Sequence, residues 1–331
     1  MRRPTFADPK TDFAFKRIFG SEEHKDVLVA FLNDMLGLSG EHRIAEVELL
    51  PPEQRPSVPE LKLSIVDVKC TDVRGVKYVV EMQVLQVEGF EKRVVYNVAK
   101  AYVNQIAQGQ AYPALNDNVE DCVHSATDSA ERGSAPPPLS GLRPPSGGHD
   151  VVGITICDFE LWPDTADRKI PMLSRWSMTE QQTGAPGLGQ IRLVFLELPK
   201  YDTSRPPQTV VEKWAYFFRE ADNLTVVPEA LAEHPFVDAL AAARTAGFTA
   251  AEWDAYILAG IAIQNERGAL SFAEKRGEER GETRGTRRGI EALCQVFGIE
   301  ITPERRAQLD RMSAADLADL LARLTTTRTW E

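Results

Sequence analysis

Residues 61–85, LKLSIVDVKCTDVRGVKYVVEMQVL, predict a β-hairpin. Two runs rich in β-branched and aliphatic residues, Leu61–Cys70 and Val76–Leu85, flank the turn-forming stretch 71–75, TDVRG. Because side chains alternate along a strand, Glu81 and Gln83 share one face of the second run with valine and leucine. Both faces are therefore mostly apolar, which predicts an inner strand that is covered on each side.

Two acids lie within these apolar runs, Asp67 in the first and Glu81 in the second. A buried free carboxylate costs several kcal/mol or more, so each acid is expected to be paired or to bind something. Carboxylate oxygens suit a hard divalent cation such as Mg²⁺, and the backbone carbonyl of Met82 could add a third ligand. The spacing D-x13-E-x-Q is weak evidence by itself, and a partly exposed pair of acids with surface partners is an equally open interpretation.

The length of 331 residues favours two domains, or one domain with a long extension. Hydrophobic residues make up 43% and charged residues 26% of the chain, as is typical of soluble proteins. No apolar run has the length of a membrane span, and the N-terminal residues lack the apolar centre of a signal peptide, so we expect no membrane partner and a cytoplasmic location. Cys70, Cys122, Cys157 and Cys294 form no C-x-x-C pair and are expected to be reduced and mostly structural.

The formal net charge is −11. Nonspecific affinity for nucleic acids comes largely from Lys and Arg contacts with phosphates. The total charge therefore disfavours a nucleic-acid partner, although it leaves a local basic surface open.

Helical and strand patterns surround the hairpin in an order that predicts an α/β sandwich. Residues 116–149 are rich in Pro, Gly and Ser and predict a disordered insertion. The expected elements are helices at Thr11–Phe19, Ser21–Leu36, Phe90–Gln108 and Thr209–Ala221, strands at Ile44–Leu50, Val151–Trp162 and Ile191–Leu198, and a loop at Pro51–Pro59.

Residues 226–331 predict a helical C-terminal region that contains the segment 273–289, AEKRGEERGETRGTRRG. Its glycines at positions 277, 281, 285 and 289 would form one stripe along a helix, although each costs roughly 1 kcal/mol relative to alanine. Two interpretations stay open. The segment is a solvated charged helix or linker, or it is a helix for self-association or nucleic-acid binding.

Six segments in order resemble the Rpn (recombination-promoting nuclease) or putative-transposase family of the PD-(D/E)XK nuclease superfamily. They are TDFAFKRIFG, the hairpin with IVDVKC and VVEMQ, EKRVVYNVAKAYVNQIAQGQAY, ITICDFELW, LVFLELPKYD and EKWAYFFRE. The resemblance implies a nuclease-like domain over residues 1–225, interrupted by the insertion at 116–149. Its implied fold is a restriction-endonuclease-like mixed sheet flanked by helices, followed by the helical C-terminal region.

The resemblance also implies roles for individual residues. Asp67 matches the strand aspartate, Glu81 the second acid, and Gln83 the position that holds lysine in the usual superfamily pattern. Glutamine cannot accept a proton, so Gln83 could orient the attacking water but not deprotonate it. Lys69 and Arg93 are candidates for phosphate contacts, although a surface salt bridge is an equal alternative for Arg93.

Three further residues carry open interpretations within the resemblance. Tyr96 lies on the helix after the hairpin, as a substrate contact or as a core residue. Asp12 and Lys16 lie in the N-terminal family segment, where they reach the metal or only cap and pack their helix.

The function implied is a Mg²⁺-dependent DNA endonuclease, with Mn²⁺ as a substitute, linked to DNA recombination or mobile elements. The alternative is a catalytically silent protein that keeps the nuclease fold as a DNA-binding or assembly module. The net acidity, the missing lysine and the glycine stripe favour that alternative. In either case the C-terminal helices are a candidate surface for a homo-oligomer.

Overall fold

The structure is a computed structural model that describes residues 3–54, 64–105, 150–166 and 168–330. The insertion predicted at 116–149 lies outside these residues. The chain divides into two compact units, Met1–Ile261 and Ala262–Glu331.

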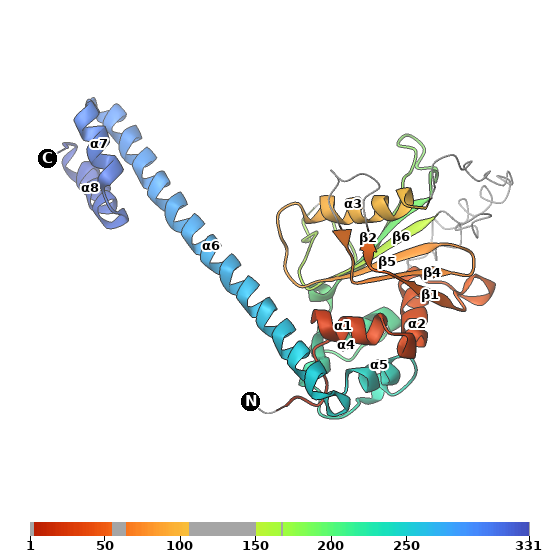
Figure 1. Cartoon of the computed structure of the whole chain (residues 1–331). Helices are drawn as coiled ribbons and strands as arrows, with labels where there is room; N and C mark the ends of the chain where they lie inside the picture. Colours follow the sequence, from red (N-terminus) through yellow and green to blue (C-terminus); the bar gives the residue numbers. More distant parts are fainter. Residues whose placement is uncertain (1–2, 55–63, 106–149, 167, 331) are drawn as a thin grey trace. The chain divides into compact units, whose positions relative to one another are not determined.

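The first unit is built on a six-stranded mixed sheet (Figure 1). Its strand order is β1-β4-β5-β6-β8-β7. β1, β4 and β5 are antiparallel, β5, β6 and β8 are parallel, and β7 returns antiparallel at the far edge. This is the expected restriction-endonuclease-like α/β class. The strands are β1 (Val47–Leu50), β4 (Val68–Asp72), β5 (Lys77–Gln83), β6 (Val151–Cys157), β7 (Leu173–Trp176) and β8 (Ile191–Glu197).

The central hairpin is confirmed, and β5 is an inner strand between β4 and β6. The first apolar run is not one strand. It divides into β3 (Ser64–Ile65) and β4, and Asp67 lies at a bend between them. β3 pairs with β2 (Glu53–Gln54) in a separate two-stranded sheet, so the stretch predicted as a loop at Pro51–Pro59 begins with a short strand.

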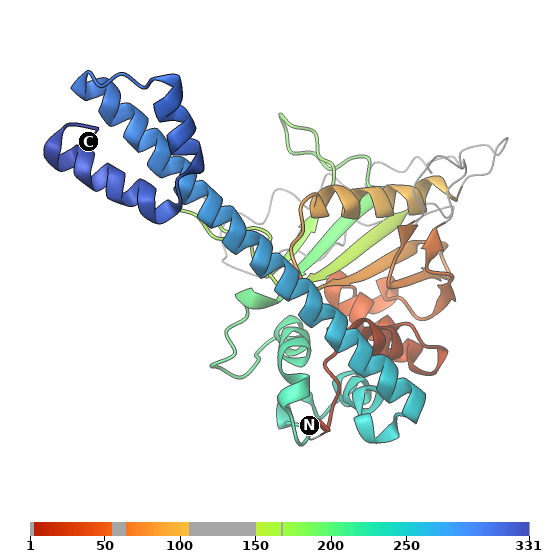
Figure 2. The ribbon, with the colours of Figure 1, turned by 60° about the vertical axis from the view of Figure 1, so that its left-hand side comes forward.

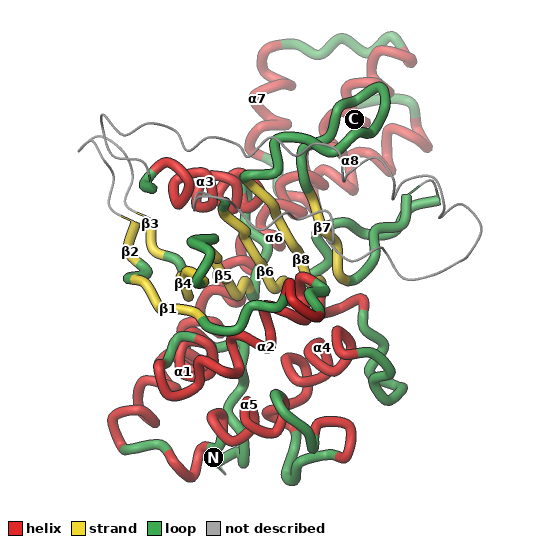
Figure 3. Tube along the Cα trace, turned by 90° about the vertical axis from the view of Figure 1, so that its right-hand side faces the viewer, coloured by secondary structure: helices red, strands yellow, loops and turns green. Residues whose placement is uncertain are grey.

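Helices cover both faces of the sheet in the first unit (Figure 3). α3 (Phe90–Val103) lies on one face of the sheet (Figure 2). There Val98 and Ala101 pack against Val79 of β5. The opposite face carries the largest core, in which Phe and Trp side chains from the helices meet Val68 and Val80 of the sheet. The helices on that face are α1 (Asp12–Phe19), α2 (Lys25–Leu36), α4 (Val210–Glu220) and α5 (Phe236–Ala243).

Two observed strands are shorter than predicted, and in both cases side chains form hydrogen bonds with the backbone beyond the strand end. Only Val47–Leu50 of the first forms a strand, since the amide of Asn33 bonds both the backbone carbonyl and the N–H of Ile44. The second ends at Cys157. Beyond it, the carboxylate of Glu197 accepts hydrogen bonds from the N–H groups of Leu161 and Trp162.

Three other features differ from expectation: the end of one helix, an additional strand and the extent of the first unit. The helix predicted over Phe90–Gln108 is observed to Val103, and residues 106–108 lie outside the described part. β7 was not predicted from the sequence, because it is a four-residue edge strand without a long apolar run. α5 and the start of α6 (Ala250–Phe297) pack with the first unit, where Trp253 and Tyr256 contact the main core.

The second unit contains the later part of α6 with α7 (Pro303–Arg311) and α8 (Ala314–Thr327). A small core joins them through Ile290, Cys294, Leu309, Leu317 and Leu320. The segment 273–289 is helical within α6 and mostly exposed. A Cβ at Gly277, Gly281 or Gly285 would meet no described atom within 4 Å.

The cysteines that the structure describes are Cys70, Cys157 and Cys294, and all three are buried and unpaired, as expected of structural thiols. Cys122 lies outside the described residues. Within the part of the chain that is described, none of the helices combines the length and the apolar character that crossing a membrane requires.

Candidate metal centre

Asp67 and Glu81 converge at the β4–β5 pair. Glu81 belongs to β5, and Asp67 directly precedes Val68, which pairs with Val80 in the antiparallel register. The charge of Asp67 raises the pKa of Glu81, as expected of two neighbouring carboxylates. The antiparallel register therefore brings together two acids that are 14 positions apart in sequence.

Asp67 is half-buried and accepts one hydrogen bond, from the backbone N–H of Met82 to Oδ2 over 2.8 Å. Burial raises the pKa of Asp67 to about 6, and the bond from Met82 opposes that rise. The nearby carboxylate of Asp12 raises the pKa further, whereas Lys16 and Arg93 lower it.

Glu81 is 9% exposed and faces α3. Its Oε1 accepts a hydrogen bond of 2.6 Å from Nδ2 of Asn97. Burial raises the pKa of Glu81 to about 7, the bond from Asn97 lowers it, and the charge of Asp67 raises it. Both acids therefore keep a proton far more readily than an exposed carboxyl group.

Asp72 and Glu197, which are more deeply buried than Asp67, show how this fold satisfies a structural carboxylate. Asp72 forms an ion pair with Arg74 and accepts bonds from Tyr78 and from backbone N–H groups. Glu197 forms an ion pair with Lys200 and accepts the two backbone bonds described above. Among the described residues, Asp67 and Glu81 each have one hydrogen bond and no ion pair, which leaves one oxygen of each for a ligand.

Gln83 lies two residues after Glu81, where the β5 strand ends. Its Nε2 donates to the carbonyl of Leu85 over 2.8 Å, and its Oε1 accepts from Nη2 of Arg93. Arg93 also lies over the ring of Phe90 at 5.6 Å and lowers the pKa of both acids. The structure thus places Gln83 and Arg93 together beside the two carboxylates.

Lys69 lies on β4 and Tyr96 on α3. Lys69 is half-buried on β4 opposite Val79, and burial lowers its pKa. The cations that act on Asp67 are Lys16 and Arg93. Tyr96 is 37% exposed, and the ammonium group of Lys100 lies 5.5 Å from its ring centroid.

Asp12 and Lys16 of α1 form an ion pair with each other over 2.6 Å. The side chain that caps α1 is Thr11, which accepts a bond from the N–H of Ala14. Because Asp12 and Lys16 both shift the pKa of Asp67, the start of α1 lies within electrostatic range of the acids.

The sequence reasoning missed a buried polar cluster behind Glu81. Oδ1 of Asn97 accepts from Oγ of Ser64 over 2.6 Å, and Nε2 of Gln54 donates to the Asn97 carbonyl over 3.2 Å. One signal was present in the sequence. Asn97 is a polar residue at helical spacing among the apolar residues Val94 and Ala101, and such a position is buried on the helix face that meets the sheet.

The donor set fits a hard divalent cation. Two carboxylates converge, each keeps an oxygen without a hydrogen bond from the described residues, and their raised pKa values show that the neighbourhood disfavours uncompensated negative charge. Asp67 and Glu81 would hold the cation. Met82 presents its N–H to Asp67, and a role for its carbonyl stays a prediction.

A comparison of the sequence with known protein families gives one match, which includes both acids. Residues 9–123 match the PD-(D/E)XK nuclease family transposases. This match over one part of the chain supports the resemblance found in the sequence. Within the described residues, the matched segment runs from α1 through the hairpin to α3 and includes both acids. No curated protein matches the chain, and no solved structure matches it either.

Proposed function

We propose that the protein is a metal-dependent DNA endonuclease whose centre is the Asp67–Glu81 pair. The family match supports a nuclease or transposase-related role. The observation that carries the finer proposal is the contrast between these two acids and the buried acids Asp72 and Glu197. Asp72 and Glu197 are neutralised by ion pairs, whereas Asp67 and Glu81 are left without one among the described residues.

Asp67 and Glu81 would hold Mg²⁺, or Mn²⁺ in its place, through the oxygens that accept no hydrogen bond. A bound divalent cation supplies a coordinated water of lowered pKa and neutralises charge that develops on the phosphoryl oxygens. The bonds from Met82 and Asn97 hold the two carboxylates in place. Because β5 and α3 are rigid elements, these bonds fix the geometry before a substrate arrives.

Gln83 would orient the attacking water, because its amide is held from both sides by Arg93 and by the Leu85 carbonyl. It cannot take the proton of that water. Arg93 is exposed and would contact a phosphate of the DNA backbone. Lys69 and Tyr96 stay candidates for weaker substrate contacts, and both are partly accessible.

The link to DNA recombination or mobile elements rests on the family description. The cytoplasmic location stays a prediction, as does a homo-oligomer through the C-terminal helices. The alternative role as a silent DNA-binding or assembly module draws on Gln83, which replaces a catalytic lysine.

The decisive experiment compares the wild type with Asp67→Asn/Glu81→Gln on supercoiled plasmid DNA, with Mg²⁺ and with EDTA. The substitutions keep shape and hydrogen-bond acceptors but remove both charges. We expect nicking only by the wild type with Mg²⁺. Equal nicking by both proteins would overturn the site. Absence of nicking by wild type, together with DNA binding that persists, would favour the silent module.

A further inference from the structure

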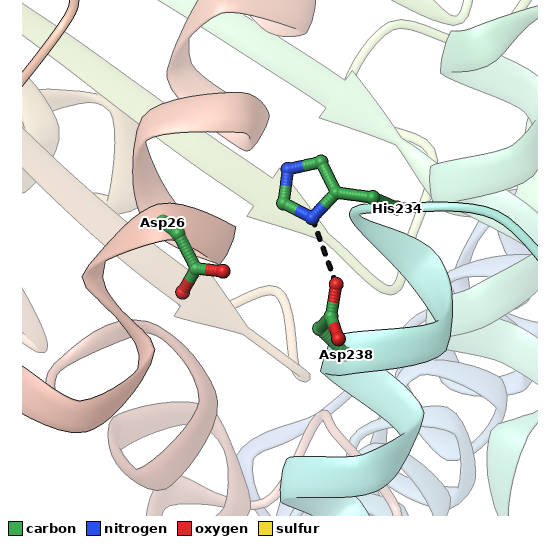
Figure 4. Close-up of side chains that lie close together, drawn as sticks. All are labelled: Asp26, His234 and Asp238. Carbon is green, nitrogen blue, oxygen red and sulfur yellow. Dashed lines mark hydrogen bonds and ion pairs between the residues drawn. The ribbon is translucent and has the colours of Figure 1, made fainter.

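A second group of metal-binding side chains lies in the first unit, away from β4 and β5 in sequence. It consists of Asp26 at the start of α2, His234 just before α5, and Asp238 in the first turn of α5 (Figure 4). One potential ligand atom from each residue lies within 4.8 Å of the other two. Tertiary packing thus joins residues that are more than 200 positions apart.

The distances suit a shared ion. Nδ1 of His234 lies 2.8 Å from Oδ2 of Asp238. Two ligands of one ion, each about 2.1 Å from it, are about 3.0 to 3.4 Å apart. Small side-chain movements would therefore admit a cation between the histidine and the two acids, and all three side chains are accessible enough to move.

The position of Asp26 is not explained by the pairing of His234 with Asp238 within one helical turn. His234 and Asp238 are four residues apart, and such pairs often stabilise the start of a helix without any ligand. Asp26 comes from another helix and has no hydrogen bond or ion pair with any described residue, whereas its neighbour Lys25 pairs with Glu22. The two carboxylates lie near one imidazole, and a cation between them would offset their mutual repulsion.

A surface pocket of about 290 Å³ adjoins the group and is lined by Asp26 and His234. The pocket is open to water and carries Lys25, Arg43 and Glu46 beside apolar residues such as Val29 and Val47. A site with three protein ligands needs such space, because water or an anion must complete the coordination of the ion.

We infer that Asp26, His234 and Asp238 form a binding site for a divalent transition metal ion such as Zn²⁺. The imidazole nitrogen distinguishes it from the oxygen-only Asp67–Glu81 pair, since nitrogen ligands favour Zn²⁺ and its neighbours over Mg²⁺. The two sites therefore differ in metal preference. The inference does not depend on nuclease activity.

The test is Zn²⁺ calorimetry on untagged, metal-free, full-length Asp67→Asn/Glu81→Gln protein, in which the other carboxylate pair is neutral. We expect binding of Zn²⁺ that weakens at least about tenfold on adding His234→Gln or, separately, Asp26→Asn. The matched control is His42→Gln, an exposed histidine outside the group, which should leave the affinity within about twofold.

Each outcome of this experiment either supports or overturns the proposed site. Weakening by both substitutions with an unchanged control supports the site. Absence of Zn²⁺ binding in the starting protein overturns it. An Asp26→Asn protein that binds as tightly as the starting protein also overturns it, because the site then lacks its third ligand. Circular dichroism of every variant confirms that the fold is intact.

Discussion

Nδ2 of Asn97 lies 2.6 Å from Oε1 of Glu81, and this hydrogen bond ties α3 to the candidate metal centre. The same asparagine accepts a bond from Ser64 of β3. Asn97 therefore connects three elements around one carboxylate, so its removal tests whether that support matters for the proposed chemistry.

Asn97→Ala should weaken Mn²⁺ binding and plasmid nicking about 10- to 100-fold, the usual effect of losing a partner of a metal ligand. The bond from Asn97 lowers the pKa of Glu81, so its loss leaves less carboxylate at pH 7. The deficit in Mn²⁺ affinity should shrink at pH 9. Ser64→Ala is the matched control, because it keeps the bond to Glu81 and should have a smaller effect. Equal affinity of Asn97→Ala and wild type at pH 7 would contradict this role.

The metal-free protein should lose stability as the pH rises. Asp67 and Glu81 have folded pKa values of about 6 and about 7, above the ordinary values of 3.8 and 4.5, so the folded state binds more protons in that interval. The contribution of the two groups is full below pH 4 and is lost as the pH passes 6 to 7.

Asp67→Asn and Glu81→Gln should therefore each raise the free energy of unfolding at pH 8 in EDTA by about 1 to 3 kcal/mol. Urea unfolding at pH 4.5 and pH 8 measures the effect, and the gain should be smaller at the lower pH. Mg²⁺ should stabilise only the wild type. Variants that are less stable than wild type at pH 8 would show that the acids are structural.

Gln83→Lys should not improve nicking, although it restores the lysine of the usual superfamily pattern. The reason is Arg93, whose guanidinium contacts the Gln83 side chain and would repel a lysine there. Gln83→Lys/Arg93→Gln should be more active than Gln83→Lys. Arg93→Gln alone completes the cycle and isolates the coupling between the two positions. If the effects of Gln83→Lys and Arg93→Gln on the nicking rate simply add in the double variant, the two positions are not coupled.

Arg93→Gln should weaken DNA binding and reduce the slope of log affinity against log salt by about one, as expected for one lost phosphate contact. Lys92→Gln is the control, since it removes the same charge from the adjacent exposed position. Fluorescence anisotropy with Asp67→Asn/Glu81→Gln protein avoids cleavage. If both substitutions change the slope equally, Arg93 acts through general charge only.

Gly281→Ala should stabilise α6 by up to about 1 kcal/mol, because the position is inside a helix and an added Cβ meets no described atom within 4 Å. Far-ultraviolet circular dichroism on thermal unfolding measures the change, and light scattering measures the mass. A wild-type dimer that becomes a monomer in Gly281→Ala would instead show that the glycine stripe is an association surface.

Local patterns predicted much of the fold. Alternation and turn residues predicted the hairpin, and apolar residues at helical spacing predicted α1, α2, α3 and α4. The boundaries were less accurate where distant side chains bind the backbone, as Asn33 does at Ile44 and Glu197 does at Leu161. Such bonds join positions that no local pattern relates.

The sequence by itself determined that Asp67 and Glu81 belong to one apolar β-hairpin, because alternation and turn residues are local properties of the chain. Only the tertiary structure decided that the two acids converge without an ion pair to any described residue, whereas Asp72 and Glu197 each have one, since pairing depends on strand register and on elements far away. The same holds for Asn97 behind Glu81 and for Asp26 beside His234. Packing creates these neighbourhoods, and with them the pKa values and the ligand sets.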